Sequence, residues 1–176
     1  MSPGRRVVIT GFMGAGKTTV GRALARRLGV GFVDLDDALA SDEGRGPREL
    51  IDEEGEDYFR AAETRALRRV LEEGAARVIA TGGGAWTLER NRSLAEGHGC
   101  ISVWLDAPYE LCRRRIEEQG DTSERPFARD PARARELYEE RLAAYARADL
   151  RVRTSPDHSP EELAAEIAAA LGSKFD

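Results

Sequence analysis

The stretch Gly11-Phe12-Met13-Gly14-Ala15-Gly16-Lys17-Thr18 fits the phosphate-loop pattern G-x-x-x-x-G-K-[ST] at every position. It follows the apolar run Val7-Val8-Ile9 and leads into residues 19–28, whose apolar residues have helical spacing. The glycines let backbone N–H groups close around an anion, and the N-terminus of a helix adds unpaired N–H groups and a favourable dipole. A glycine-rich turn that carries a lysine by coincidence would not be flanked by both strand and helix. The sequence therefore predicts a site for a phosphorylated nucleotide.

The phosphate-loop pattern assigns a contact to each of its last residues. Lys17 is predicted to reach the β- and γ-phosphates, and Thr18 to offer its hydroxyl to Mg²⁺. The remaining predicted nucleotide contacts are Gly14, Ala15, Gly16 and Thr19.

Length and composition limit the class of protein. The chain has 176 residues, which predicts one domain, residues 1–176, with one hydrophobic core. Its 27 Lys and Arg and 32 Asp and Glu give a net charge of −5, so we expect no nucleic-acid partner and no membrane partner. Cys100 and Cys112 stand too far apart for a C-x-x-C pair and are expected to be buried or half-buried thiols. The N-terminus leads directly into a short strand, which favours a cytoplasmic protein without signal peptide or membrane span.

Short apolar runs alternate with longer segments of helical periodicity, which is typical of an α/β fold with a parallel sheet. The predicted strands are Val7–Ile9, Gly31–Val33, Val78–Ala80, Ile101–Leu105 and Leu150–Val152. An amphipathic helix is predicted over Glu56–Glu73, and Ser159-Pro160-Glu161-Glu162 predicts the start of a last helix. The breaker-rich segment Gln119–Pro131 is long for a loop, which favours a functional or mobile element.

Two carboxylates follow the second predicted strand. Asp34 and Asp36 stand at its carboxyl end, where open α/β sheets place their ligands, and strand alternation would put them on the same side. A Mg²⁺-nucleotide needs an acidic partner, and an acceptor alcohol needs a carboxylate to accept its proton. Asp36 or Asp37 could instead cap the helix that follows, and for Asp37 we prefer this interpretation.

A triple glycine follows the third predicted strand. Gly82, Gly83 and Gly84 would destabilise a regular element, so they indicate backbone that approaches a ligand closely or adopts positive φ. Arg60 stands about one turn into the preceding helix and has a fork that suits a carboxylate, although an arginine on a helix is more often only solvated.

The chain resembles shikimate kinase in the order and spacing of six motifs along nearly its whole length. The motifs are the phosphate loop, Asp34-Leu35-Asp36, Gly55-Glu56-x-x-Phe59-Arg60-x-x-Glu63, Thr81-Gly82-Gly83-Gly84, Arg125-Pro126 and Arg141-x-x-x-Tyr145. The resemblance implies a P-loop α/β three-layer sandwich of the nucleoside monophosphate kinase type, with a five-stranded parallel sheet in the order 2-3-1-4-5 and a mobile lid at about residues 119–131. It implies ATP-dependent phosphorylation of the 3-hydroxyl of shikimate, a step toward chorismate and the aromatic amino acids. Members of this family are commonly monomeric, so we expect a monomer.

The resemblance also implies a role for each residue on the metal and substrate side. Asp34 would hold Mg²⁺ through water, and Asp36 would hydrogen-bond the substrate hydroxyls and act as the base. Arg60 and Arg141 would bind the shikimate carboxylate beside the backbone of Gly82, Gly83 and Gly84.

On the nucleotide side, the resemblance implies that Arg125 swings in with the lid to contact the transferring phosphate. This role agrees with the need for positive charge where charge builds up in the transition state. The adenine would lie between Arg115 and the loop around Pro160.

The chain departs from the family pattern at two places. Ala38-Leu39-Ala40 stands where the family usually has an Ile-Glu pair, and Phe127-Ala128 stands where two leucines usually follow the Arg-Pro of the lid. Neither change removes a group with assigned chemistry, so we expect effects on substrate packing and lid geometry rather than on the reaction.

Two other functions remain compatible with the phosphate loop. One is a kinase for another small hydroxylated carboxylate such as gluconate, against which the Glu56-x-x-Phe59-Arg60 motif and the triple glycine argue together. The other is a weakly catalytic nucleotide-binding module, against which the complete set of catalytic groups argues. A His and Cys metal site is not predicted, because His98 and His158 are isolated from each other and from the cysteines.

Overall fold

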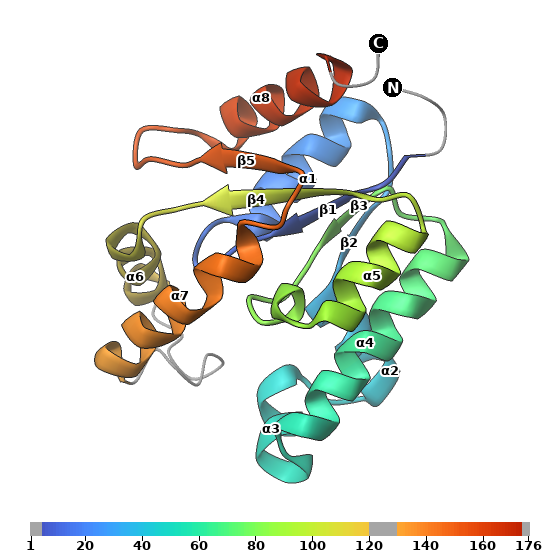
Figure 1. The fold of residues 1–176 in the computed structure, drawn as a ribbon, viewed down its shortest axis with the longest axis vertical. Coiled ribbons are helices and arrows are strands. Elements are labelled where there is room, and N and C mark those ends of the chain that lie inside the picture. Colours follow the sequence, from blue (N-terminus) through green and yellow to red (C-terminus); the bar gives the residue numbers. More distant parts are fainter. Residues whose placement is uncertain (1–4, 120–129, 174–176) are drawn as a thin grey trace.

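A five-stranded parallel sheet forms the centre of the molecule (Figure 1). The structure, a computed structural model, describes residues 5–119 and 130–173. The strands pair in the order β2-β3-β1-β4-β5, and every pair is parallel. Their bounds are β1 Val7–Thr10, β2 Phe32–Asp34, β3 Val78–Ala80, β4 Ile101–Asp106 and β5 Leu150–Arg153. The strand order expected from the sequence is confirmed.

Helices cover both faces of the sheet and complete a three-layer sandwich. In Figure 1, α1 and α8 lie on one side of the sheet, and α4, α5 and α7 lie on the other. The bounds are α1 Lys17–Leu28, α2 Leu35–Glu43, α3 Pro47–Glu54, α4 Glu56–Glu73, the 3₁₀ helix η1 Ala85–Thr87, α5 Glu89–Gly97, α6 Tyr109–Glu118, α7 Pro131–Tyr145 and α8 Pro160–Ser173. None of the helices in the described residues is long and apolar enough to span a bilayer.

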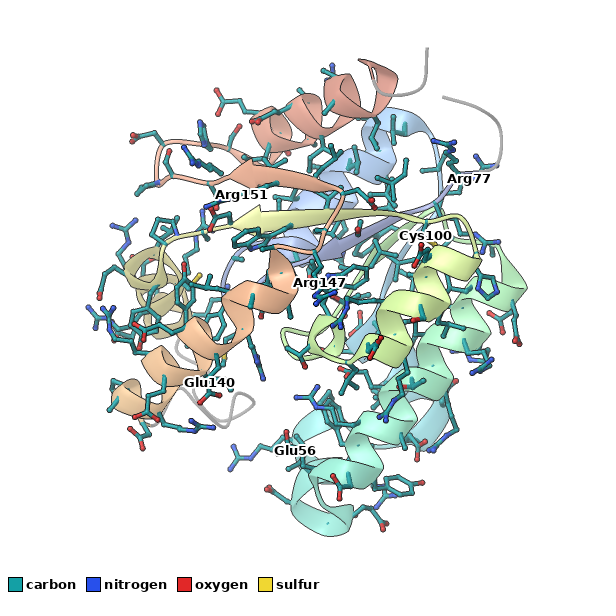
Figure 2. All side chains as sticks on the ribbon, viewed as in Figure 1. Glu56, Arg77, Cys100, Glu140, Arg147 and Arg151 are labelled. Atoms are coloured by element: carbon teal, nitrogen blue, oxygen red, sulfur yellow. The ribbon has the colours of Figure 1, made fainter. Side chains whose placement is uncertain are left out.

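The apolar runs of the sequence form the middle of the sheet. All residues of β1 and β3 are buried, because helices cover both faces of these strands. The edge strand β2 is only half-buried, and β5 exposes alternate residues; Arg151 of β5, labelled in Figure 2, lies over the ring of Trp104. The centre of the sheet is therefore part of the hydrophobic core.

Two helices confirm particular sequence predictions. In α4 the predicted apolar face is buried, and it contains Phe59, Leu67, Val70 and Leu71. At the start of α8, Ser159 and Glu162 form a reciprocal capping box: the Ser159 N–H donates to the Glu162 carboxylate at 2.8 Å, and the Glu162 N–H donates to Ser159 Oγ at 3.2 Å.

Both cysteines are free thiols, as predicted. Cys112 is buried and Cys100 is half-buried. Burial raises the pKa of the Cys100 thiol to about 11, so at neutral pH this side chain is an uncharged thiol.

Candidate active site

A cleft of about 460 Å³ opens at the carboxyl ends of β1, β2 and β3. Residues of α4 and α7 line this cleft; in Figure 2, Glu56 marks the start of α4, and Glu140 lies on α7. The cleft is lined by every described residue for which the sequence predicted a role: Gly14, Ala15, Gly16, Lys17, Thr18, Thr19, Asp34, Asp36, Arg60, Gly82, Gly83, Gly84, Arg115, Arg141 and Pro160. The structure therefore brings the residues predicted for the nucleotide and those predicted for the metal and substrate into one cleft.

The phosphate loop depends on its glycines for backbone conformation and for room. Gly11, Gly14 and Gly16 have φ values of 146°, 79° and 97°, a region that side-chain-bearing residues rarely adopt. A Cβ on Gly11 would lie 2.7 Å from the Leu105 carbonyl oxygen, and one on Gly14 would lie 2.6 Å from that of Cys112. The loop is therefore held between the end of β4 and α6.

Lys17 is the first residue of α1 and lies across the loop that precedes it. Its Nζ donates to the carbonyl oxygens of Gly11 and Phe12, both at 2.9 Å, and the residue is only 9% exposed. The ammonium group is thus held beside the N-terminus of α1, where the helix dipole and unpaired N–H groups favour an anion.

Asp34 joins the phosphate loop to the start of α2. Thr18 Oγ1 donates to Asp34 Oδ2 at 2.5 Å, and the Asp36 N–H donates to Asp34 Oδ1 at 2.9 Å. Asp34 is therefore the N-cap of α2, and the interpretation that Asp37 caps this helix is wrong. Strand alternation also does not relate Asp34 to Asp36, because β2 ends at Asp34 and the helix begins at Leu35. Both side chains nevertheless line the cleft.

Thr18 and Asp34 offer a hydroxyl and a carboxylate oxygen to a metal ion. In residues 5–119 and 130–173, no group of three or more His, Cys, Asp or Glu side chains could hold a metal ion by itself. A cation at Thr18 and Asp34 would therefore need oxygen ligands from water or from a phosphate, as Mg²⁺ in nucleotide sites usually has.

The triple glycine makes room for charged side chains of the protein itself. A Cβ on Gly83 would lie 3.2 Å from Arg141 Nη1, and one on Gly84 would collide with the Arg60 guanidinium, 2.6 Å from its Cζ. None of the three glycines has positive φ, so of the two predicted alternatives only close approach can apply to this segment. Close approach of the two arginines explains why the segment carries no side chains.

Gly82 lies against two carboxylates. A Cβ there would lie 3.0 Å from Glu63 Oε2 and 3.1 Å from Asp36 Oδ1. Glu63 is fully buried and accepts a hydrogen bond from Arg60 Nη1 at 2.9 Å through its other oxygen. Two acids, Asp36 and Glu63, and two arginines, Arg60 and Arg141, thus surround residues 82–84. We call this part of the cleft the acceptor side, after the acceptor alcohol that the sequence predicts.

Burial shifts the titration of this group. Desolvation raises the pKa of Glu63 and outweighs the neighbouring Arg60, while the charge of Asp36 raises it further. Burial also lowers the pKa of Arg141, which is 7% exposed. Both shifts have burial as their largest cause, and an anion beside a buried arginine interacts with it more strongly than it would in water.

The far end of the cleft is formed by α6 and the start of α8. Arg115 Nη1 donates to the Ala15 carbonyl at 3.1 Å and approaches that of Gly14 at 3.4 Å. Pro160 lines the same region, as does His158. His158 is exposed, but it lies at the edge of the cleft.

Sequence reasoning gave no role to several residues that line the cleft. Pro47, Arg48 and Ile51 come from α3, whose sequence carries no motif that would indicate a site. Glu63 was part of the quoted motif, and the spacing of three residues from Arg60 could have indicated their ion pair. Arg125 and Phe127-Ala128 lie outside the described residues.

Comparisons with known proteins agree with this geometry. The sequence profile of the shikimate kinase family matches residues 13–172. The shikimate kinase of Ruegeria pomeroyi is 43% identical over 98% of this chain and 87% of its own length, and that of Geobacter sulfurreducens is 44% identical over 95% and 91%. The structure of shikimate kinase from Acinetobacter baumannii in complex with shikimate has a TM-score of 0.87 and 34% identity, covering 97% of this chain and 94% of that one. The chain therefore belongs to the shikimate kinase family and is a small-molecule kinase.

Proposed function

We propose that this kinase transfers the γ-phosphoryl group of ATP to the 3-hydroxyl of shikimate, giving shikimate 3-phosphate and ADP. The observation that carries the proposal is that the phosphate loop, Asp36, Arg60 and Arg141 line one cleft of about 460 Å³. A cleft of this size suits small molecules. Residues 1–176 would act as one domain, as a monomer and in the cytoplasm.

The nucleotide phosphates would bind to the loop N–H groups and the N-terminus of α1. Lys17, whose ammonium group already lies on this loop, would contact the β- and γ-phosphates. Gly14 to Gly16 and Thr19 would surround the phosphates, and Arg115 and Pro160 would enclose the adenine.

Thr18 and Asp34 would hold Mg²⁺, Thr18 directly and Asp34 through water. Their oxygens lie 2.5 Å apart and are the hard ligands that Mg²⁺ prefers. When bound, the ion would neutralise charge on the phosphates.

The acceptor would bind through its carboxylate to Arg60 and Arg141, beside the backbone of Gly82, Gly83 and Gly84. Its 3-oxygen would attack the γ-phosphorus in line, the bond from that phosphorus to ADP would break, and Asp36 would take the hydroxyl proton. Positioning and electrostatic stabilisation would supply most of the acceleration. Arg125, outside the described residues, would contact the transferring phosphoryl group.

A coupled assay of ADP release tests this proposal. We expect turnover that depends on shikimate and stops when EDTA removes Mg²⁺, with shikimate 3-phosphate identified by phosphorus NMR. Gluconate, offered at the same concentration, should give only the background rate of ATP hydrolysis. Absence of shikimate-dependent turnover at millimolar shikimate, or faster turnover with gluconate, would overturn the proposal.

A further inference from the structure

Tyr145, the last residue of α7, links two parts of the acceptor side. The side chain is 0% exposed, and its hydroxyl donates to the Gly83 carbonyl oxygen at 2.5 Å. The guanidinium of Arg141, one helical turn earlier, interacts with the same hydroxyl group. Arginine has no acceptor, so the guanidinium can only face the Tyr145 oxygen as a donor, while the hydroxyl proton is donated to Gly83.

The ring of Tyr145 is held rigidly. Its centroid lies 6.0 Å from that of Trp104, which is buried on β4. Arg141 and Tyr145 are four residues apart, so they share one face of α7, and this helix packs against η1, which directly follows the triple glycine. A buried ring carries little motion to its hydroxyl, so the position of that oxygen is set by the core.

The hydroxyl keeps its proton throughout the working pH range. Burial raises the pKa of Tyr145 to about 12, and it outweighs the opposing effect of the Arg141 charge. The phenol therefore remains a donor to Gly83, and it also presents an oxygen lone pair to a guanidinium that burial has deprived of water.

The hydrogen bond from Tyr145 to the Gly83 carbonyl oxygen fixes the orientation of the peptide group that joins Gly83 to Gly84. In a trans peptide the N–H points opposite to the carbonyl, so the Gly84 N–H points away from Tyr145. Among the described residues, no hydrogen-bond partner of this N–H is found. Gly84 lines the cleft, so a ligand there is the natural partner.

We propose that Tyr145 is a positioning residue for the acceptor. Its hydroxyl sets the distance between the Arg141 guanidinium and the Gly83–Gly84 peptide, so that a carboxylate-bearing acceptor meets both in one orientation. This inference rests on the proposed function, because it assigns Arg141 and the triple glycine to the acceptor. Tyr145 itself touches neither reacting atom.

The substitution Tyr145→Phe tests the inference, because it removes one oxygen and leaves the ring in the core. We expect the KM for shikimate to rise about tenfold, the size of one lost hydrogen bond to a charged group, while the KM for ATP stays unchanged. Calorimetric titration of shikimate without nucleotide should show the same loss.

Tyr138→Phe is the matched control. Tyr138 lies on the same helix, and its hydroxyl also donates to a backbone carbonyl, that of Ala107 at 3.0 Å. It should lose a similar amount of thermal stability without a change in the KM for shikimate. A general structural role of Tyr145 would instead move both KM values or neither.

The outcomes separate the two proposals. Wild-type turnover of shikimate with Tyr145→Phe equal to Tyr138→Phe in KM would overturn the positioning role alone. A wild type that neither binds nor phosphorylates shikimate would overturn the proposed function and this inference with it. If Tyr145→Phe is too unstable for kinetics, the increase in Tm caused by shikimate decides: it should be smaller than in Tyr138→Phe, and an equal increase contradicts the proposal.

Discussion

The nucleotide side and the acceptor side of the cleft both depend on glycines, but for different physical reasons. In the phosphate loop, Gly11, Gly14 and Gly16 have positive φ, so the path of the backbone requires them. In the segment 82–84 no glycine has positive φ, and each would place a Cβ against a charged side chain of another element. The first site is shaped by a local backbone conformation, and the second is shaped by long-range packing.

This difference predicts which substitutions disturb each side of the cleft. Eight consecutive residues build the phosphate loop, so a change there acts within one short segment. The acceptor side takes Asp36 from α2, Arg60 from α4 and Arg141 from α7, and it exists only when these helices are docked. Substitutions that affect one side and leave the other intact therefore test the comparison.

The largest effect is expected from Asp36→Asn. An amide cannot accept the hydroxyl proton, so kcat should fall about 10³-fold, within the range for loss of a general base. ATP affinity, measured by fluorescence titration, should change less than about twofold, because Asp34 and Thr18 are untouched. An equal loss of turnover and ATP affinity would assign Asp36 to the metal instead.

Lys17→Met should give the next largest effect on the opposite side. Loss of the ammonium group removes charge stabilisation from the phosphates, and kcat should fall about 10²-fold or more. Shikimate binding in the absence of ATP should be retained, because the Lys17 ammonium group is hydrogen-bonded to the Gly11 and Phe12 carbonyls of the phosphate loop. Calorimetry with shikimate checks this, and a large loss of binding would show that the two sides are not independent.

The same contrast explains how far the sequence predicts the structure. Strand β3 and helix α4 have the predicted bounds, Val78–Ala80 and Glu56–Glu73, because hydrophobic periodicity and glycine punctuation are local signals. The phosphate loop is equally local, and residues 14–19 line the cleft together.

The errors concern the boundary between β2 and α2 and contacts between distant segments. Asp34 caps α2 because β2 ends at this residue, which apolar runs alone do not specify. The use of Gly84 as space for Arg60 depends on how α4 docks, and nothing within residues 82–84 encodes it. The contribution of Pro47 and Ile51 from α3 to the cleft is also set by packing.

Gly84→Ala tests whether packing determines the glycine at this position of the acceptor side. The new Cβ would collide with the Arg60 guanidinium, so the variant should lose about 1–3 kcal/mol of stability, and the KM for shikimate should rise as Arg60 moves. Gly97→Ala is the control, because an added Cβ there would meet no atom of the described residues outside its own helix within 4 Å, and Gly97 has no positive φ; this variant should gain up to about 1 kcal/mol. Urea unfolding of both variants measures the difference. Equal stabilities would mean that the segment 82–84 tolerates side chains and that the packing explanation is wrong.

The smallest expected effect is a pH dependence of stability caused by Glu63, which is buried on the acceptor side. Desolvation raises the pKa of Glu63 in the folded protein above its ordinary value of 4.5, so the folded state binds this proton more tightly than the unfolded state. The resulting stabilisation is complete below pH 4.5 and is lost as the pH rises through the folded-state pKa. Glu63→Gln cannot titrate, so its free energy of unfolding relative to wild type should increase across this window, by at most about 1.4 kcal/mol per pH unit.

Urea unfolding of wild type and Glu63→Gln at pH steps from 4.5 upward measures this increase, with the exposed Glu72→Gln of the same helix as background. The carboxamide oxygen of Glu63→Gln can still accept the hydrogen bond from Arg60 Nη1, and the charge of Arg60 already contributes to the folded-state pKa of Glu63, so the slope reports the net effect of burial and charge. A difference that stays constant with pH would show that Arg60 and Arg141 fully compensate the burial of Glu63. Burial of Glu63 would then have no net electrostatic effect on stability, and the contrast between the two sides would rest on packing alone.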